Sequence, residues 1–321
     1  MKKSSLFIII IFISSCKEQN TKLRYLPDSN ANINELTVVM PEKSWAGGLG
    51  KKTRELLETP YEGLPFNEPQ FTLKYLSPKI FTGFARNSRS ILWFVRDSLA
   101  RFQLSEDLMA QPQTVAMVKG EDDDVQAYFF EENIDLFKAV LTEKERKEKS
   151  RRIKKSPNKD KDFQERFSIS LIYPTAYKTV KDTTNFIWIQ KEIPKGHMNL
   201  VAYSIPMSSL MGNIKKRIPE IRDSIGRNYI PGRLKGSYMI TEKAYRPYYY
   251  KTRKEGRLTY LTKGTWEVAN DFMAGPFINY MIKDTLKKRW MVIEGFVFAP
   301  ASNKRDQMFE LNTILESVVF E

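Results

Sequence analysis

Two apolar runs near the C-terminus, Ile278-Asn279-Tyr280-Met281-Ile282 and Trp290-Met291-Val292-Ile293 through Phe298, decide the fold class of this chain. Each run has the length of a typical strand. Turn-forming and charged residues separate them, which predicts a hairpin. A helix is expected to follow from about Ser302 to Ser317. The predicted fold therefore ends with a unit of two strands followed by a helix.

The same order of elements recurs twice earlier in the chain. Residues 186–189 and 200–203 are predicted strands followed by a helix at about 208–224. Residues 91–95 and 114–118 are predicted strands followed by a helix from about Asp122. The recurrence predicts an α+β fold in which antiparallel sheet is built from repeated strand-strand-helix units with helices on one face. Alternating β and α elements with parallel pairing is the weaker alternative.

The charge pattern divides the chain. The helix that begins near Asp122 has an apolar stripe up to Leu141, but residues 143–162 are nearly all charged. Such a segment is typical of a solvated helix end or of a disordered linker. The sequence therefore predicts an N-terminal α+β half over 35–142, a charged helix end or linker over 143–164, and a C-terminal α+β half over 165–321.

The first residues predict export. Lys2 and Lys3 precede the apolar run 6–13, which is far too short to cross a bilayer and is typical of a signal peptide. The ending Ile13-Ser14-Ser15-Cys16 resembles the lipobox of bacterial lipoproteins, in which the cysteine receives a diacylglyceryl group. We expect a signal peptide over 1–15, lipidation at Cys16, and a polar tether over 16–34.

The predicted location is therefore the cell envelope, as an outer-membrane lipoprotein held to the membrane through Cys16. Lys17 followed by Glu18 resembles the surface-export signal of Bacteroidota lipoproteins, but that pattern usually carries two acids. Residence on the cell surface and residence facing the periplasm both stay open. A cysteine at the cleavage position with no second cysteine in the chain also excludes a structural disulfide.

Composition indicates a folded domain with a basic surface. The chain has 41% hydrophobic residues, and 52 Lys and Arg against 38 Asp and Glu give a formal net charge of +14. In an exported protein this charge favours an anionic polymer, anionic lipid headgroups or simple solubility rather than nucleic acid. The expected partners are the membrane, an envelope protein or an anionic polymer, and no nucleic acid.

Catalytic and metal motifs are missing from the sequence. The glycines before Lys51 resemble a phosphate-binding loop, but Trp45 and Lys52 stand where that loop needs glycine and Ser or Thr. His197, the only histidine, is expected in an exposed hairpin turn, so neither a zinc site nor a Ser-His-Asp triad can be built. We expect no catalytic residue, no metal and no cofactor.

Two aromatic segments are candidate binding surfaces. The first contains Tyr245, Tyr248 and Tyr249 beside Arg and Lys, residue types that dominate binding hot spots, although a strand with alternate tyrosines packed inward is the simpler interpretation. The second runs from Trp266 to Phe277 and includes Glu267, Asn270 and Asp271. Its Gly-Pro-Phe sequence demands a defined bend, which fits a structural turn and the floor of a pocket equally well.

Several stretches together resemble a family of uncharacterised Bacteroidota lipoproteins, domain of unknown function 4837. They are Asn34-Glu35-Leu36 with Val38-Val39-Met40, Trp45 with Gly50, the run from Trp266 to Phe277, and Glu294-Gly295-Phe296-Val297-Phe298-Ala299-Pro300. The resemblance spans nearly the whole mature chain. It implies an exported, lipid-anchored envelope protein and no particular activity.

The predicted function is a non-enzymatic binding or assembly component of the envelope. On this hypothesis Trp266→Ala weakens capture of the partner without unfolding the protein. The alternative is a hydrolase of an envelope polymer that uses paired carboxylates such as Glu267 and Asp271. An enzyme requires both carboxylates within a few ångströms in a deep cleft, whereas a binder requires an aromatic contact surface.

Overall fold

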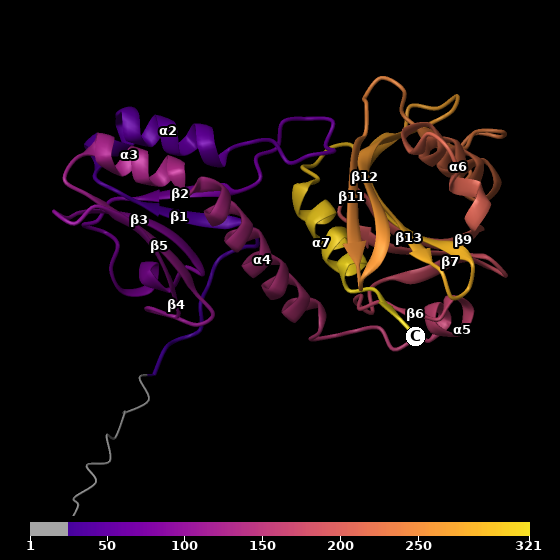
Figure 1. Ribbon diagram of the computed structural model, residues 1–321, viewed down its shortest axis with the longest axis horizontal. Coiled ribbons are helices and arrows are strands. Elements are labelled where there is room, and N and C mark those ends of the chain that lie inside the picture. Colours follow the sequence, from indigo (N-terminus) through magenta and orange to yellow (C-terminus); the bar gives the residue numbers. More distant parts are fainter. Residues whose placement is uncertain (1–24) are drawn as a thin grey trace, which may run out of the picture.

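A computed structural model describes residues 25–321, and Figure 1 shows two units joined by one long helix. Cys16, the predicted signal peptide and the first part of the predicted tether lie outside the described residues. The mixed helix and strand content confirms the α+β class. None of the helices within 25–321 has the length and apolar character needed to cross a bilayer.

The N-terminal unit is built on a five-stranded sheet with the order β2-β1-β3-β5-β4. Strands β1, β2, β3 and β5 pair in parallel, and β4 pairs with β5 antiparallel. The sequence predicted antiparallel pairing here. The segments between the paired strands instead return the chain to the same end of the sheet, so that most of the strands run in the same direction and pair in parallel. The strands are β1 Glu35–Val39, β2 Thr72–Leu76, β3 Ser90–Arg96, β4 Arg101–Glu106 and β5 Thr114–Gly120.

Helices cover one face of this sheet. Leu36, Leu92 and Phe94 from the strands pack against Phe130 and Phe137 from the helices. The opposite face carries the short 3-10 helix η1 (Gly83–Asn87) and the loop after β4. The covering helices are α1 Glu42–Ala46, α2 Gly48–Leu57, α3 Asp123–Glu132 and α4 Ile134–Ile153.

The charged segment is helical over its first half, and several of its side chains are buried or half-buried there. Helix α4 continues to Ile153, and the Glu145 side chain is buried within it. Glu145 forms a salt bridge of 2.9 Å with buried Arg89 at the start of β3. Lys149 donates a hydrogen bond of 2.7 Å to Glu310 of helix α7 (Arg305–Glu316). Ion pairs with distant partners therefore replace the missing apolar stripe and dock α4 onto both units (Figure 1).

The C-terminal unit is built on an antiparallel sheet whose main path is β10-β12-β13-β14-β9-β8-β7, with β11 pairing beside β12. Strand β14 pairs with β9 along ten residue positions, so the predicted units merge into one sheet. The strands are β7 Lys178–Thr183, β8 Phe186–Ile193, β9 Gly196–Pro206, β10 Met239–Thr241, β11 Tyr248–Lys254, β12 Arg257–Val268, β13 Ala274–Asp284 and β14 Arg289–Phe298. A small separate pair joins β6 Ile169–Ser170 to β15 Val319–Phe320.

Helices α6 (Ile214–Tyr229) and α7 lie on opposite faces of this sheet (Figure 1). Two neighbouring residues of β13 show the reason: the Tyr280 side chain belongs to the hydrophobic core that includes α7, and the Met281 side chain belongs to the hydrophobic core that includes α6. Both faces of the sheet are buried, which explains why its central strands are continuously apolar. Helices on a single face, as the sequence predicted, do not occur here. The remaining helices are α5 Asp162–Phe167 and the 3-10 helix η2 Met207–Leu210.

Helix α6 begins six residues later than predicted and ends five residues later. Asn213 caps its first turn, because the side-chain oxygen accepts a hydrogen bond of 3.1 Å from the Lys215 N–H. Its inner face carries Arg222, which donates a hydrogen bond of 2.9 Å to Glu294 of β14. The guanidinium also lies 3.8 Å from the centre of the Phe277 ring. A buried ion pair therefore holds α6 over the middle of the sheet.

Candidate functional site

A pocket of about 230 Å³ opens between the sheet and the chain that follows α6. We call it the tryptophan pocket. Aromatic and thioether groups from strands β8, β10, β12 and β14 form most of its wall, and polar groups are found at its rim. The residues that matter for its chemistry are Trp188, His197, Arg233, Met239, Trp266 and Phe296.

Strand periodicity brings these side chains together. Trp188 and Gln190 are two residues apart on β8, and Trp266 and Val268 are two residues apart on β12, so each pair faces the same side of the sheet. The Trp266 ring meets Phe296 edge-on with ring centres 5.7 Å apart. The alternation that buries Trp266 therefore also places the neighbouring aromatic rings on one wall.

A hydrogen bond and a glycine fix the two tryptophans. The Trp188 indole N–H donates to Asn199 Oδ1 at 2.9 Å, which sets the orientation of its ring. Trp266 lies opposite Gly275 on the neighbouring strand. A Cβ atom at Gly275 would stand 2.0 Å from the Val297 carbonyl oxygen and 3.1 Å from Trp266 Nε1. The Gly-Pro-Phe sequence therefore serves close strand packing under the pocket wall.

The rim of the pocket carries an ion pair between Arg233 and Asp271. Arg233 donates hydrogen bonds of 2.7 and 3.1 Å to the two Asp271 oxygens, and this interaction lowers the pKa of Asp271. Asn270 adopts a left-handed conformation with φ of 66°, which turns the chain at this point. Asp271 is thus held as a carboxylate that anchors a loop, a state that does not suit a general acid.

Glu267 and Asp271 do not come together, and neither of them lines the pocket. Glu267 follows Trp266 directly on β12, so its side chain leaves the opposite face of the strand. The two acids of the hydrolase hypothesis therefore belong to different environments. Within residues 25–321 there is also no cluster of three His, Cys, Asp or Glu residues with the arrangement of a metal site.

His197 is part of the wall rather than of an exposed turn. The turn between β8 and β9 is at Lys195, which has a φ of 64°. His197 comes two residues later and is already paired with Glu192 of β8. Burial lowers the pKa of His197, although the nearby Glu192 carboxylate opposes this effect. The imidazole is consequently neutral at pH 7 and presents a weakly polar surface beside Phe298, 5.4 Å away between ring centres.

The tyrosine segment lies at the other end of α6. Tyr245 and Tyr248 are exposed, whereas the Tyr249 hydroxyl donates a hydrogen bond of 3.1 Å to the Lys215 carbonyl in the first turn of α6. The tryptophan pocket begins just beyond the last residue of that helix, at Ile230. Sixteen helical residues span about 24 Å. The tyrosines therefore do not line the pocket, although Pro247 and Phe277 from the two predicted segments both approach Gly264.

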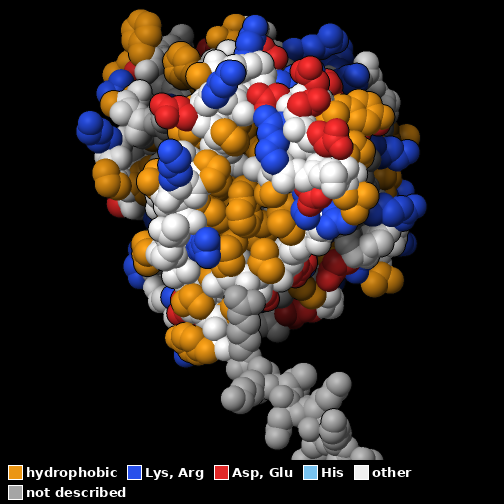
Figure 2. All heavy atoms as spheres, turned by 90° about the vertical axis from the view of Figure 1, so that its left-hand side faces the viewer, with side chains coloured by type: hydrophobic (Ala, Val, Ile, Leu, Met, Phe, Trp, Pro, Cys, Tyr) orange, Lys and Arg blue, Asp and Glu red, His pale blue; other side chains and the backbone are white. Residues whose placement is uncertain are grey.

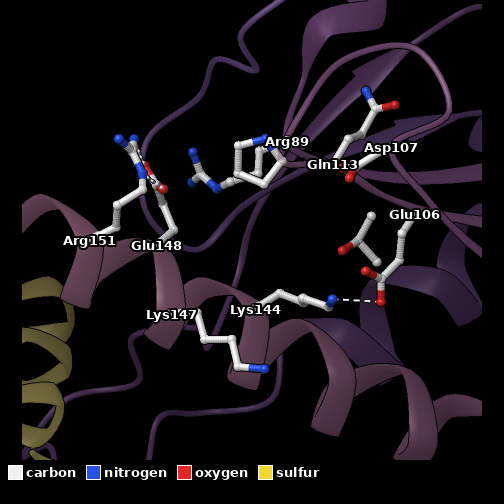
Figure 3. Close-up of a pocket in the computed structure, with 10 residues that line it drawn as sticks. Arg89, Glu106, Asp107, Gln113, Lys144, Lys147, Glu148 and Arg151 are labelled. Carbon is white, nitrogen blue, oxygen red and sulfur yellow. Dashed lines mark hydrogen bonds and ion pairs between the residues drawn. The ribbon is translucent and has the colours of Figure 1, made fainter. Parts of the chain in front are cut away.

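A second pocket, of about 240 Å³, lies beside α4 in the N-terminal unit (Figure 3). Figure 3 shows Lys144 reaching across to Glu106 and, on α4 itself, Arg151 beside Glu148. These pairs measure 2.5 and 2.7 Å. Its charges are therefore already compensated within the protein, which indicates a structural ion-pair network rather than a binding site.

The sequence identified Trp266 and Asp271 near the pocket but missed Trp188, Arg233 and Phe296. Trp188 was noticed as a strand residue, and Phe296 as part of a strand and of the family resemblance, but each comes from a different strand from Trp266. Period-two alternation was the available signal, because it places one aromatic side chain of each strand on the face of Trp266. Arg233 had no local signal.

Two family models match consecutive parts of the chain. The description Domain of unknown function (DUF4837) applies to residues 156–317, about half of the chain, and Domain of unknown function (DUF8532) applies to residues 29–154. The stretches around Asn34, Trp45 and Gly50 therefore fall in the second match, and the resemblance to the first family covers the C-terminal half only. A comparison with curated proteins finds no match.

Solved structures show only remote likeness. The Ran-binding protein Mog1p of Saccharomyces cerevisiae has 10% identity and a TM-score of 0.33, covering 48% of this chain and 90% of its own. The cyanobacterial PsbP of Synechocystis has 11% identity and a TM-score of 0.34, covering 52% and 92%. A STAR-related lipid transfer protein of Xanthomonas axonopodis has 8% identity and a TM-score of 0.24, covering 44% and 96%. Likenesses at these scores carry no argument about function.

Proposed function

The chain belongs to the family described as domain of unknown function DUF4837, and we propose that it binds a partner protein by enclosing one apolar side chain in the tryptophan pocket. The observation that carries the proposal is a preformed pocket with aromatic walls and a polar rim. Such sites are the usual form of a binding site in an otherwise well-packed domain.

The size of the pocket favours a side chain over a whole small molecule. Its volume of about 230 Å³ is below the range of about 300 to 1,000 Å³ that is typical of ligand pockets. One apolar side chain that fills a desolvated hollow is the usual anchor of a protein interface. Phe272, which is fully exposed, directly follows Asp271 of the rim and extends the apolar contact surface.

The burial of the tryptophans separates this proposal from polymer binding. A sugar polymer stacks on aromatic rings whose faces are open to solvent, but Trp266 is only 3% exposed and Trp188 is half-buried. The wall therefore offers a hollow rather than a platform. Hydrolysis by paired carboxylates receives no support either, because Asp271 is held in its ion pair and Glu267 faces away.

The proposal includes attachment to the membrane through Cys16, with the folded units in the cell envelope as an outer-membrane lipoprotein. The support for this part is the signal-like sequence that ends at Cys16. Metabolic labelling with a palmitate analogue should mark the wild-type protein and fail with Cys16→Ala. Proteinase digestion of intact and lysed cells then decides between the cell surface and the periplasmic side.

Methyl NMR tests the pocket directly. The mature chain carrying Cys16→Ser is labelled at its methionine methyl groups and titrated with indole, a mimic of the tryptophan side chain. Met239 and Met273 line the pocket, so their signals should shift saturably. Met109 and Met117 of the N-terminal unit should not shift. Equal shifts at all four methionines, or shifts with N-acetylglucosamine instead of indole, would contradict the proposal.

Two variants on one face of β8 provide the matched control. Gln190 lines the pocket, and Glu192 lies two residues further along the same face, outside it. Gln190→Trp should fill the hollow and reduce indole affinity at least tenfold, whereas Glu192→Trp should leave it unchanged. If Gln190→Trp binds indole as well as the wild type does, the tryptophan pocket is not the binding site.

A further inference from the structure

The face of the five-stranded sheet that lacks helices carries an apolar surface. Leu76, Trp93, Leu108, Met109 and Met117 lie on it and are only partly buried. Figure 2 shows hydrophobic side chains gathered in the middle of this side of the molecule. The adjoining residues Ile80 and Phe84 are 59% and 77% exposed. We call this set of seven residues the open face.

The start of the described chain is fixed at the edge of the open face. The Ser29 N–H donates to the Gln111 carbonyl at 2.9 Å, and the Asn30 N–H donates to the Asn87 carbonyl at 2.8 Å. Residues 27–30, which the sequence assigned to the tether, are therefore bound beside η1 and the loop that carries Leu108 and Met109. Tyr25, the first described residue, lies two positions before this segment.

Basic side chains without acidic partners surround the open face. Lys79, Arg86 and Arg101 are exposed, and no salt bridge within residues 25–321 involves them. Among the nearby acids, Asp97 pairs with Lys119 at 2.7 Å and Glu106 pairs with Lys144 at 2.5 Å, which leaves the three bases facing the two exposed acids Asp28 and Asp107. The rim of the open face is thus positive.

We propose that the open face docks on an anionic lipid bilayer. This inference rests on the proposed attachment through Cys16, because the eight residues between Cys16 and Tyr25 reach at most about 30 Å. The attachment point would then lie beside the open face and hold it against the membrane. Exposed apolar side chains enter the interface between headgroups and acyl chains, and the surrounding Lys and Arg contact anionic headgroups.

Vesicle cosedimentation tests docking without the lipid anchor. The mature chain carrying Cys16→Ser is mixed with vesicles of phosphatidylcholine alone or with one quarter phosphatidylglycerol. Binding should be stronger to the anionic vesicles and should fall as salt rises. Ile80→Ser/Phe84→Ser should reduce binding at least tenfold. Each of Lys79→Gln and Arg101→Gln should reduce it roughly fivefold on anionic vesicles only.

The matched control removes equally exposed apolar residues from the C-terminal unit. Met211 and Leu286 are 70% and 82% exposed, and Met211→Ser/Leu286→Ser should leave vesicle binding unchanged. Absence of binding to anionic vesicles, or equal losses in both double variants, would overturn the proposal and leave the open face to a protein partner. Palmitate labelling at Cys16 is read separately, so loss of the anchor and loss of docking are distinguishable.

Discussion

Glu145→Gln should destabilise the N-terminal unit far more than its conservative chemistry suggests. The Glu145 carboxylate is 1% exposed and accepts four hydrogen bonds of 2.9 to 3.0 Å. The donors are the Asn34 N–H, the Ser90 hydroxyl and two nitrogens of Arg89, whose side chain is 4% exposed. An amide keeps one accepting oxygen and directs an NH₂ group at the other donors. Arg89 is then left buried without its counter-charge.

Removing one partner of a buried ion pair costs about 3 to 5 kcal/mol. The whole free energy of unfolding of a typical domain is about 5 to 15 kcal/mol. We therefore expect a large decrease in the urea concentration at the unfolding midpoint of Glu145→Gln, measured by circular dichroism. Glu143→Gln is the control on the same helix, since Glu143 is 44% exposed, and it should change the unfolding free energy by less than about 1 kcal/mol.

The double replacement Arg89→Met/Glu145→Leu completes the test. Because it removes both charges together, it should recover part of the stability that Glu145→Gln loses, while the Asn34 N–H and the Ser90 hydroxyl still lose their acceptor. If the free energy of unfolding of Glu145→Gln is within about 1 kcal/mol of the wild-type value, the buried pair does not hold α4 to the sheet. The same conclusion follows if Glu143→Gln and Glu145→Gln behave alike.

Three further predictions follow from the fold. Gly275→Ala should lower the melting temperature by several degrees, since its Cβ would stand 2.0 Å from the Val297 carbonyl, whereas Gly48→Ala meets nothing within 4 Å and should be neutral. Trp266→Ala should lower the free energy of unfolding, measured by heat or urea, by about 3 to 5 kcal/mol, because the ring is buried. Loss of partner binding in this variant would therefore not be a test of binding alone, which the sequence had suggested. Burial raises the pKa of Glu148, but hydrogen bonds from Arg151 and Arg152 outweigh this effect and lower the pKa to about 2. A lowered pKa stabilises the fold above about pH 4.5, and this contribution is lost as the pH falls toward 2. Stability measured over that range should therefore depend less on pH in Glu148→Gln.

Local patterns predicted the central strands well. The runs 278–282 and 290–298 fall within β13 and β14, because a sheet covered on both faces needs apolar residues at every position. The same argument could not give the pairing partners. Whether β1 joins β2 in parallel or antiparallel depends on the crossover between them, and β14 meets β9 across roughly ninety residues of intervening chain.

Charge was the least reliable signal. A run such as 143–153 is normally solvated, and the sequence around Glu145 does not reveal that Arg89, 56 residues away, neutralises it. The site was limited in a similar way. Trp266 was a candidate because of its own surroundings, but the hollow beside it depends on Trp188 and Phe296 from other strands and on Arg233 from a loop.

Helix α4 has a mechanical consequence for an anchored protein. It is twenty residues long, or about 30 Å; Phe137 and Leu141 pack its first half on the sheet, and Glu145 and Lys149 in its second half pair with Arg89 and Glu310. If the open face docks on a membrane as proposed, this rigid helix also fixes the height and orientation of the tryptophan pocket above the lipid. A partner protein would then meet the pocket at a constant distance from the lipid.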